Sequence, residues 1–149
     1  MHYASDNSTG INTRTIAARK DNRLDGLILV LKAYVQLIRF NRHLAGNAFT
    51  RLYDVVRMYP LATVRVHTVD SGQICHAVDL ACIWYWKEVL CLQRSAATTC
   101  VLRDAGIPAK MVLGVQHVPF RAHAWVEVEG RVVNDKPYMR DLYSVLDVC

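Results

Sequence analysis

The sequence predicts an α+β domain in which helices precede an antiparallel β-sheet. Apolar residues recur at three- and four-residue steps through the first two thirds of the chain, as in helices. The period then changes to two over residues 109–115, 122–128 and 131–135, as in strands. Helices followed by strands, without alternation of the two, are typical of α+β domains. A chain of 149 residues can bury such a core without disulfides or metals.

The helical region divides into four segments, expected over about 21–38, 48–58, 73–90 and 91–106. Pro60 follows the second segment, and Gly106 with Pro108 ends the fourth. Between the second and third, residues 62–69 alternate and predict a short strand or an extended linker. The first segment carries an apolar stripe that we expect to pack in the core: Leu24, Leu27, Ile28, Leu31, Val35 and Ile38.

The N-terminal residues 1–20 are rich in Ser, Asn, Thr and Gly and are expected to be disordered, followed by a single domain over 21–149. The first ten residues show no basic-then-apolar leader. Five cysteines, an odd number in a chain of this length, do not suit a secreted disulfide framework. These features predict a cytoplasmic protein with reduced thiols.

The net charge of +5 lies in the N-terminal half of the chain. Residues 1–60 carry nine Lys/Arg and four Asp/Glu, whereas residues 61–149 carry nine of each. The basic half is either a surface for an acidic peptide or partner, or a solvated helix face. Its arginines occur singly and outside any nucleic-acid-binding motif, so nucleic acid is not an expected partner. The longest apolar stretch, residues 24–40, is interrupted by Lys32, Gln36 and Arg39, which predicts no membrane span.

Cys91 is the candidate nucleophile. A reactive cysteine needs a lowered pKa, a nearby imidazole and a group that orients the imidazole. Cys91 opens a predicted helix, whose free N–H groups and positive dipole end favour a thiolate and can receive an oxyanion. Cys100 lies nine residues later, half a turn around the same helix, and is expected in the core together with Cys75 and Cys82. A cysteine at a helix start is, taken alone, more often an ordinary buried thiol.

The candidate imidazole and its orienting group lie in the predicted hairpin, at His123 and Asp135. A two-residue loop would direct their side chains to opposite faces of the sheet. A three-residue loop with a left-handed Gly130 would set His123 opposite Asp135, and Glu127 opposite Arg131. The catalytic interpretation therefore requires the odd-length loop.

Two other residues stay open as participants. Asn134 is the alternative orienting group, since Cys-His-Asn arrangements also work in cysteine proteases. His117 lies near the candidate site in sequence, with a weaker case for a direct role. The chain has no phosphate-binding glycine motif and no metal-ligand spacing, so neither a cofactor nor a metal is expected.

The segments "CLQRSAATTCVLRDAGIPAKMVLGV" and "PFRAHAWVEVEGRVVND" resemble the transglutaminase-like superfamily and, within it, the stand-alone leader peptidases of lasso-peptide biosynthesis. The resemblance implies a papain-like or transglutaminase-like fold, with N-terminal helices and a nucleophile-bearing helix packed on an antiparallel β-sheet. It implies that Cys91 is the nucleophile, His123 the general base and acid, and Asp135 the orienting carboxylate.

The implied reaction is hydrolytic cleavage of the leader from a ribosomally synthesised lasso precursor peptide. This frees the core peptide for macrolactam cyclisation by a separate ATP-dependent lasso cyclase. A separate leader-recognition protein is also implied, because the region ahead of the catalytic segment is helical and too short to hold a complete recognition domain. Two alternatives remain. One is acyl transfer to an amine by the same triad, and the other is a non-catalytic scaffold in a peptide-maturation complex.

Overall fold

A computed structural model describes residues 12–44, 49–64 and 69–149 of the chain. Its elements, in chain order, are α1 (Asn12–Leu44), α2 (Phe49–Arg57), α3 (Ser71–Ile83), α4 (Cys91–Asp104), β1 (Ala109–Gln116), β2 (Arg121–Val128), β3 (Arg131–Val132), α5 (Met139–Leu142) and β4 (Ser144–Val148). The strands form one antiparallel sheet in the order β3-β2-β1-β4. The α+β prediction is therefore confirmed.

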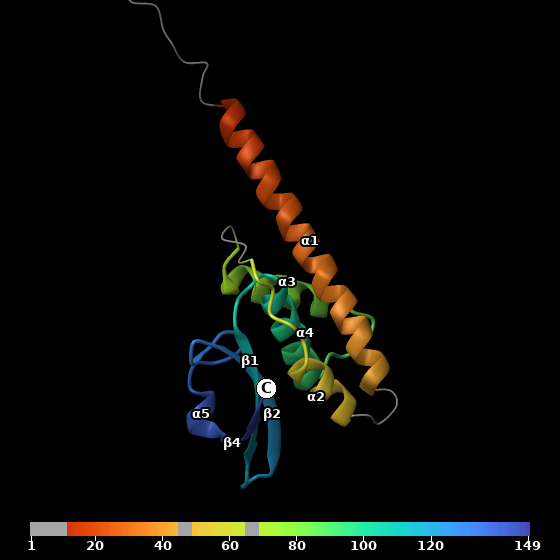
Figure 1. Cartoon of the computed structure of the whole chain (residues 1–149), viewed down its shortest axis with the longest axis vertical. Coiled ribbons are helices and arrows are strands. Elements are labelled where there is room, and N and C mark those ends of the chain that lie inside the picture. The colour runs from red at the N-terminus through yellow and green to blue at the C-terminus, as the bar shows by residue number, and fades with distance from the viewer. Residues whose placement is uncertain (1–11, 45–48, 65–68) are drawn as a thin grey trace, which may run out of the picture.

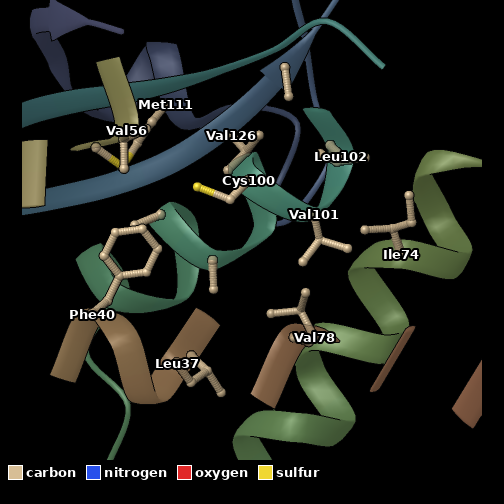
Figure 2. Packing of buried hydrophobic residues seen from close by; sticks show 14 of the residues in the cluster. Leu37, Phe40, Val56, Ile74, Val78, Cys100, Val101, Leu102, Met111 and Val126 are labelled. Carbon is tan, nitrogen blue, oxygen red and sulfur yellow. The ribbon is translucent and has the colours of Figure 1, made fainter. Parts of the chain in front are cut away.

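The sheet has a helical layer on one face and the short helix α5 on the other (Figure 1). The main core lies between the sheet and the helices α1, α3 and α4 (Figure 2). Helix α2 also contributes to this core through Val56. The residues labelled in Figure 2 are Leu37, Phe40, Val56, Ile74, Val78, Cys100, Val101, Leu102, Met111 and Val126. A smaller cluster on the far face joins Val112, Trp125 and Met139. Because strand side chains alternate, the odd-numbered residues of β2 lie on this far face.

Helix α1 turns its predicted apolar stripe outward. Leu24, Leu27, Ile28, Leu31, Val35 and Ile38 are 38–67% exposed, so their expected packing in the core is wrong. The buried side of the helix carries Ala33, Leu37 and Phe40 instead. Because α1 is apolar on two opposite sides, helical periodicity finds both stripes but cannot tell which one meets the sheet.

Helix α1 also begins earlier than expected, at Asn12 rather than near Asp21. The expected disorder of residues 1–20 stays a prediction. Residues 1–11 lie outside the described ranges. The assignment of 21–149 to a single domain stays a prediction. In its N-terminal half α1 extends well past the other elements (Figure 1). No helix among residues 12–44, 49–64 and 69–149 combines the length and the apolar character that crossing a bilayer requires.

The remaining helices differ from the prediction mainly at one end. Helix α3 stops at Ile83, before the predicted Leu90. The chain turns there, and the buried Tyr85 donates a hydrogen bond to the Leu37 carbonyl (3.4 Å). Residues 62–64 and 69 form no strand, and residues 65–68 of that expected segment lie outside the described ranges. Helix α4 starts at Cys91, as predicted.

Two elements after residue 135 were not predicted. Strand β4 pairs with β1 on the edge away from β2, with a register shift between Leu113 and Gly114 of β1. All but the last of its residues are exposed, so it lacks the alternation that marks a half-buried strand. Helix α5 has only four residues, too few for a helical period.

Candidate active site

His123 and Asp135 are in direct contact. The Nε2 atom of His123 lies 2.9 Å from Oδ2 of Asp135, and the two side chains are only 23% and 19% exposed. The Lys136 N–H donates a hydrogen bond to the other carboxylate oxygen, at 2.8 Å. Burial raises the pKa of Asp135, but the hydrogen bonds from His123 and Lys136, with the charges of His123 and Arg94, lower it more. The net pKa lies below the ordinary value, so Asp135 is a carboxylate in contact with the imidazole.

The hairpin reaches this contact by a route that we did not predict. Val128 pairs with Arg131, so the loop has two residues, Glu129 and Gly130. Both have positive φ, of 52° and 77°, as a type I′ turn requires. The predicted odd-length loop is therefore wrong, and Glu127 lies opposite Val132 rather than Arg131.

The side chain of Asn134 ends the β2–β3 ladder. The Val133 N–H donates to the Val126 carbonyl (3.0 Å), as an extended β3 would require. The Val126 N–H, however, donates to the side-chain oxygen of Asn134 (2.7 Å). Strand pairing stops at this point, so the strict alternation of faces no longer governs Asp135, which follows. This is why His123 and Asp135 meet despite the even-length loop.

Asn134 also ties the hairpin to helix α4. Its amide nitrogen donates to Oγ of Ser95 (3.1 Å), and Ser95 donates to the Ala124 carbonyl (2.9 Å). Asn134 and Ser95 are both buried. Both polar atoms of the Asn134 side chain therefore have partners other than His123. The sequence suggested neither of these structural roles, although both residues lie within the segments quoted above.

Cys91 is the first residue of α4 and follows the N-cap Leu90. The apolar Leu90 side chain cannot accept a hydrogen bond from the first-turn N–H groups. The first turn of α4 also carries no acidic residue. Helix α3, by contrast, has a complete capping box formed by Asp70 and Gln73. The half-buried Cys91 thiol thus lies at an uncapped helix start, where N–H groups and the positive dipole end are available to an anion.

The start of α4 lies beside the strand that carries His123. Ser95, which bonds to Ala124, is one helical turn after Cys91, or about 6 Å along the axis. The charge of Arg94 in the same turn acts on Asp135. Within the described residues, no hydrogen bond joins the Cys91 thiol to His123, and none is made by the His123 Nδ1 atom. The structure therefore brings His123 and Asp135 together and puts Cys91 at the adjoining helix end.

The other four cysteines have the character of packing residues. Burial raises the pKa of Cys100 to about 12 and that of Cys75 to about 11. Burial also raises the pKa of Cys82 and of Cys149. These thiols stay protonated at neutral pH, which makes them poor nucleophiles.

His117 is exposed in the β1–β2 turn. The ranges 12–44, 49–64 and 69–149 contain no group of three or more His, Cys, Asp or Glu residues placed to hold a metal ion. The candidate site therefore consists of Cys91, His123 and Asp135, with Asn134 and Ser95 supporting it.

Comparison with known proteins assigns the family. The sequence model of the transglutaminase-like superfamily matches residues 30–148, a span that holds all three candidate residues. The chain therefore belongs to the transglutaminase-like superfamily, and the predicted family and fold are confirmed. The chain is also similar to the microcin J25-processing protein McjB of Escherichia coli, with 48% identity over 56 residues. That match covers 38% of this chain but only 27% of McjB. No solved structure matches the chain.

Proposed function

We propose that this protein is a cysteine peptidase that cleaves the leader from a ribosomally synthesised lasso precursor peptide, with Cys91, His123 and Asp135 as its triad. The observation that carries the proposal is the His123–Asp135 contact beside the uncapped helix start at Cys91. Similarity to a protein named for processing microcin J25 supports a precursor peptide as the substrate.

The first half of the proposed reaction forms an acyl-enzyme. Asp135 holds the imidazole through Nε2, which leaves Nδ1 to take the thiol proton of Cys91. The thiolate attacks the scissile carbonyl carbon, and the first-turn N–H groups of α4 stabilise the resulting oxyanion. His123 returns the proton to the leaving amine, which becomes the new N-terminus of the core peptide. The leader remains attached to Cys91 as a thioester.

The second half releases the leader. His123 takes a proton from water, and the hydroxyl oxygen attacks the thioester carbonyl. The tetrahedral intermediate collapses, the Cys91 sulfur leaves and regains a proton from His123, and the leader departs with a free carboxylate. His123 carries each proton between Cys91, the leaving amine and water, and the new carboxyl group of the leader releases its own proton to solvent.

The partners that we propose are the precursor, a separate leader-recognition protein and an ATP-dependent lasso cyclase that closes the freed core. The exposed apolar stripe of α1 suits the recognition protein, because Leu31 and Val35 are 64% and 55% exposed and the exposed Lys32 and Arg39 flank them. All five cysteines are free thiols, and a thiolate nucleophile persists in a reducing compartment, so we place the activity in the cytoplasm.

Incubation of the purified chain with a candidate lasso precursor peptide, with and without a candidate leader-recognition protein, tests the proposal. Mass spectrometry should detect free leader and free core peptide. Cys91→Ala should abolish cleavage, whereas Cys82→Ala, a matched change in a packing cysteine, should preserve it. Cleavage that survives Cys91→Ala would refute the assignment.

Acyl transfer is the second candidate, because the chain belongs to the transglutaminase-like superfamily. The same thioester can react with an amine instead of water. Adding a small primary amine to the reaction separates the two. A peptidase yields leader with a free carboxylate, and an acyltransferase yields leader whose mass is increased by the amine. A scaffold without catalysis would yield neither product.

A further inference from the structure

The far face of the sheet holds a set of aromatic rings around His123. His123 pairs across the sheet with Gly114. A Cβ atom at Gly114 would lie 2.7 Å from the Trp125 ring and 2.9 Å from Cβ of Tyr143, so only glycine lets these side chains close in. The centroid of the imidazole lies 6.4 Å from that of Trp125 and 5.4 Å from that of Tyr143. The imidazole therefore has one aromatic neighbour on its own strand, Trp125, and one at the C-cap of α5, Tyr143.

An ion pair between the buried carboxylate of Glu127 and the half-exposed Arg140 fixes one of these rings. Glu127 is only 4% exposed, and it accepts a hydrogen bond from the indole N–H of Trp125 (2.9 Å). Arg140 of α5 donates two hydrogen bonds to the same carboxylate, both at 2.7 Å, in a bidentate pair. The hydrogen bonds from Arg140 lower the pKa of Glu127 more than burial raises it, so the group is a carboxylate at neutral pH.

This pair joins α5 to the strand that carries the imidazole. Arg140 lies on α5, and Tyr143 follows that helix directly. One short segment therefore supplies both the partner of Glu127 and a ring beside His123. A hydrogen bond at one ring nitrogen leaves a histidine free to rotate about that bond. Rings packed beside the imidazole remove this freedom, because a rotated ring would collide with them. A bidentate guanidinium–carboxylate pair adds directional restraint that a single contact lacks.

We propose that Arg140 and Tyr143 are positioning residues for His123, acting through Glu127 and Trp125 to hold the imidazole with Nε2 on Asp135 and Nδ1 open to Cys91. This inference rests on the proposed function, since it takes Cys91 as the group that His123 serves. It gives a role to the α5 segment, which lies outside the motifs that carry the family resemblance.

The test measures the alkylation rate of Cys91 by iodoacetamide as a function of pH, with each cysteine followed by peptide mass spectrometry. This readout needs no substrate. A positioned imidazole keeps Cys91 reactive at pH 6, where an ordinary thiol is almost entirely protonated. Tyr143→Ala and Arg140→Lys should lower the rate at pH 6 about tenfold and leave the rate at pH 9 unchanged. Tyr143→Phe, which keeps the ring, should behave as the wild type, as should the matched surface change Arg131→Lys.

A purely structural role predicts a different pattern, in which the variants melt at lower temperature but keep the wild-type pH profile while folded. That pattern would overturn the inference. If Arg140→Lys fails to fold, Tyr143→Ala still decides, because it leaves the Glu127–Arg140 pair intact. Failure of the proposed function is a separate result. In that case the wild type leaves the precursor uncut, whether or not the pH profile of Cys91 depends on Tyr143.

Discussion

The Nε2 atom of His123 lies 2.9 Å from Oδ2 of Asp135, although the register of their hairpin alone would direct the two side chains to opposite faces of the sheet. The Asn134 side chain accepts the hydrogen bond from the Val126 N–H, in place of the backbone carbonyl that continued strand pairing would supply. Strand pairing therefore stops before Asp135, and the contact can form. The site thus depends on an interruption of regular structure at a strand end.

Asn134→Ala should therefore damage both stability and activity. It leaves the buried Val126 N–H without an acceptor, which costs about 1–3 kcal/mol of the free energy of unfolding. It also frees the backbone that carries Asp135, so precursor cleavage should fall at temperatures where the variant remains folded. Urea denaturation and single-turnover cleavage measure the two effects. Loss of stability with wild-type cleavage would show that Asn134 does not place Asp135.

Substitution of Asp135 separates orientation from charge. Asp135→Ala removes the partner of His123 and should lower kcat by roughly 10²- to 10⁴-fold. Asp135→Asn keeps a hydrogen-bond acceptor and should retain more activity than the alanine variant, because a Cys-His-Asn arrangement can work in cysteine proteases. Asp141→Asn, at an exposed residue of α5, is the matched control. Equal activity of all three variants and the wild type would remove Asp135 from the site.

Thiol reactivity should single out one cysteine. In the native chain, Cys91 should react with iodoacetamide first, because it is half-buried at an uncapped helix start. Cys75 and Cys100 should react only after unfolding, since burial raises their pKa values to about 11 and about 12. Time-resolved labelling with peptide mass spectrometry measures the order. His123→Ala should slow the labelling of Cys91 and leave the other cysteines unaffected.

How much of this site the sequence could predict depends on the kind of signal. Helix periods, the alternation of β1 and β2 and the start of α4 at Cys91 are local patterns, and the structure contains these elements, although the ends of α1 and α3 differ from those expected. The choice between the two apolar sides of α1 is not local, because it depends on which side meets the sheet. The alternation of strand faces predicted a three-residue turn, because only that turn would set His123 opposite Asp135. The turn has two residues, because the Asn134 side chain accepts a strand hydrogen bond in place of a backbone carbonyl. The Glu127–Arg140 pair spans 13 residues and has no periodic signal.

The outward stripe of α1 should bind a partner if our assignment of the recognition protein is correct. Leu31→Glu or Val35→Glu would place a charge in the buried centre of such an interface and should weaken binding at least tenfold. The triad is untouched, so the rate of Cys91 alkylation should not change. Met58→Glu, at an 80%-exposed residue after α2, is the matched control. Isothermal titration calorimetry with the recognition protein measures the affinity, and unchanged affinity would favour a solvated surface.

Acid should weaken the fold through Glu127 and Asp135, whose carboxylates both have lowered pKa values. The pKa of Glu127 lies below its ordinary 4.5 because of the Arg140 hydrogen bonds, despite opposing burial. A carboxylate with a lowered folded-state pKa stabilises the fold fully above its unfolded value, and that contribution disappears as pH falls through the folded value. The melting temperature should therefore be steady near neutral pH and fall below about pH 4.5.

Comparison with Glu127→Gln isolates this contribution. The variant should melt below the wild type at pH 7, because a neutral amide replaces the buried carboxylate that accepts hydrogen bonds from Arg140 and Trp125. The difference between the two melting temperatures should shrink as pH falls below 4.5, since the wild type then loses the same charge. Glu129→Gln, at the exposed hairpin turn, should show no such pH-dependent difference. A difference that stays constant down to pH 3 would mean that the charge of Glu127 contributes nothing to the stability of the fold.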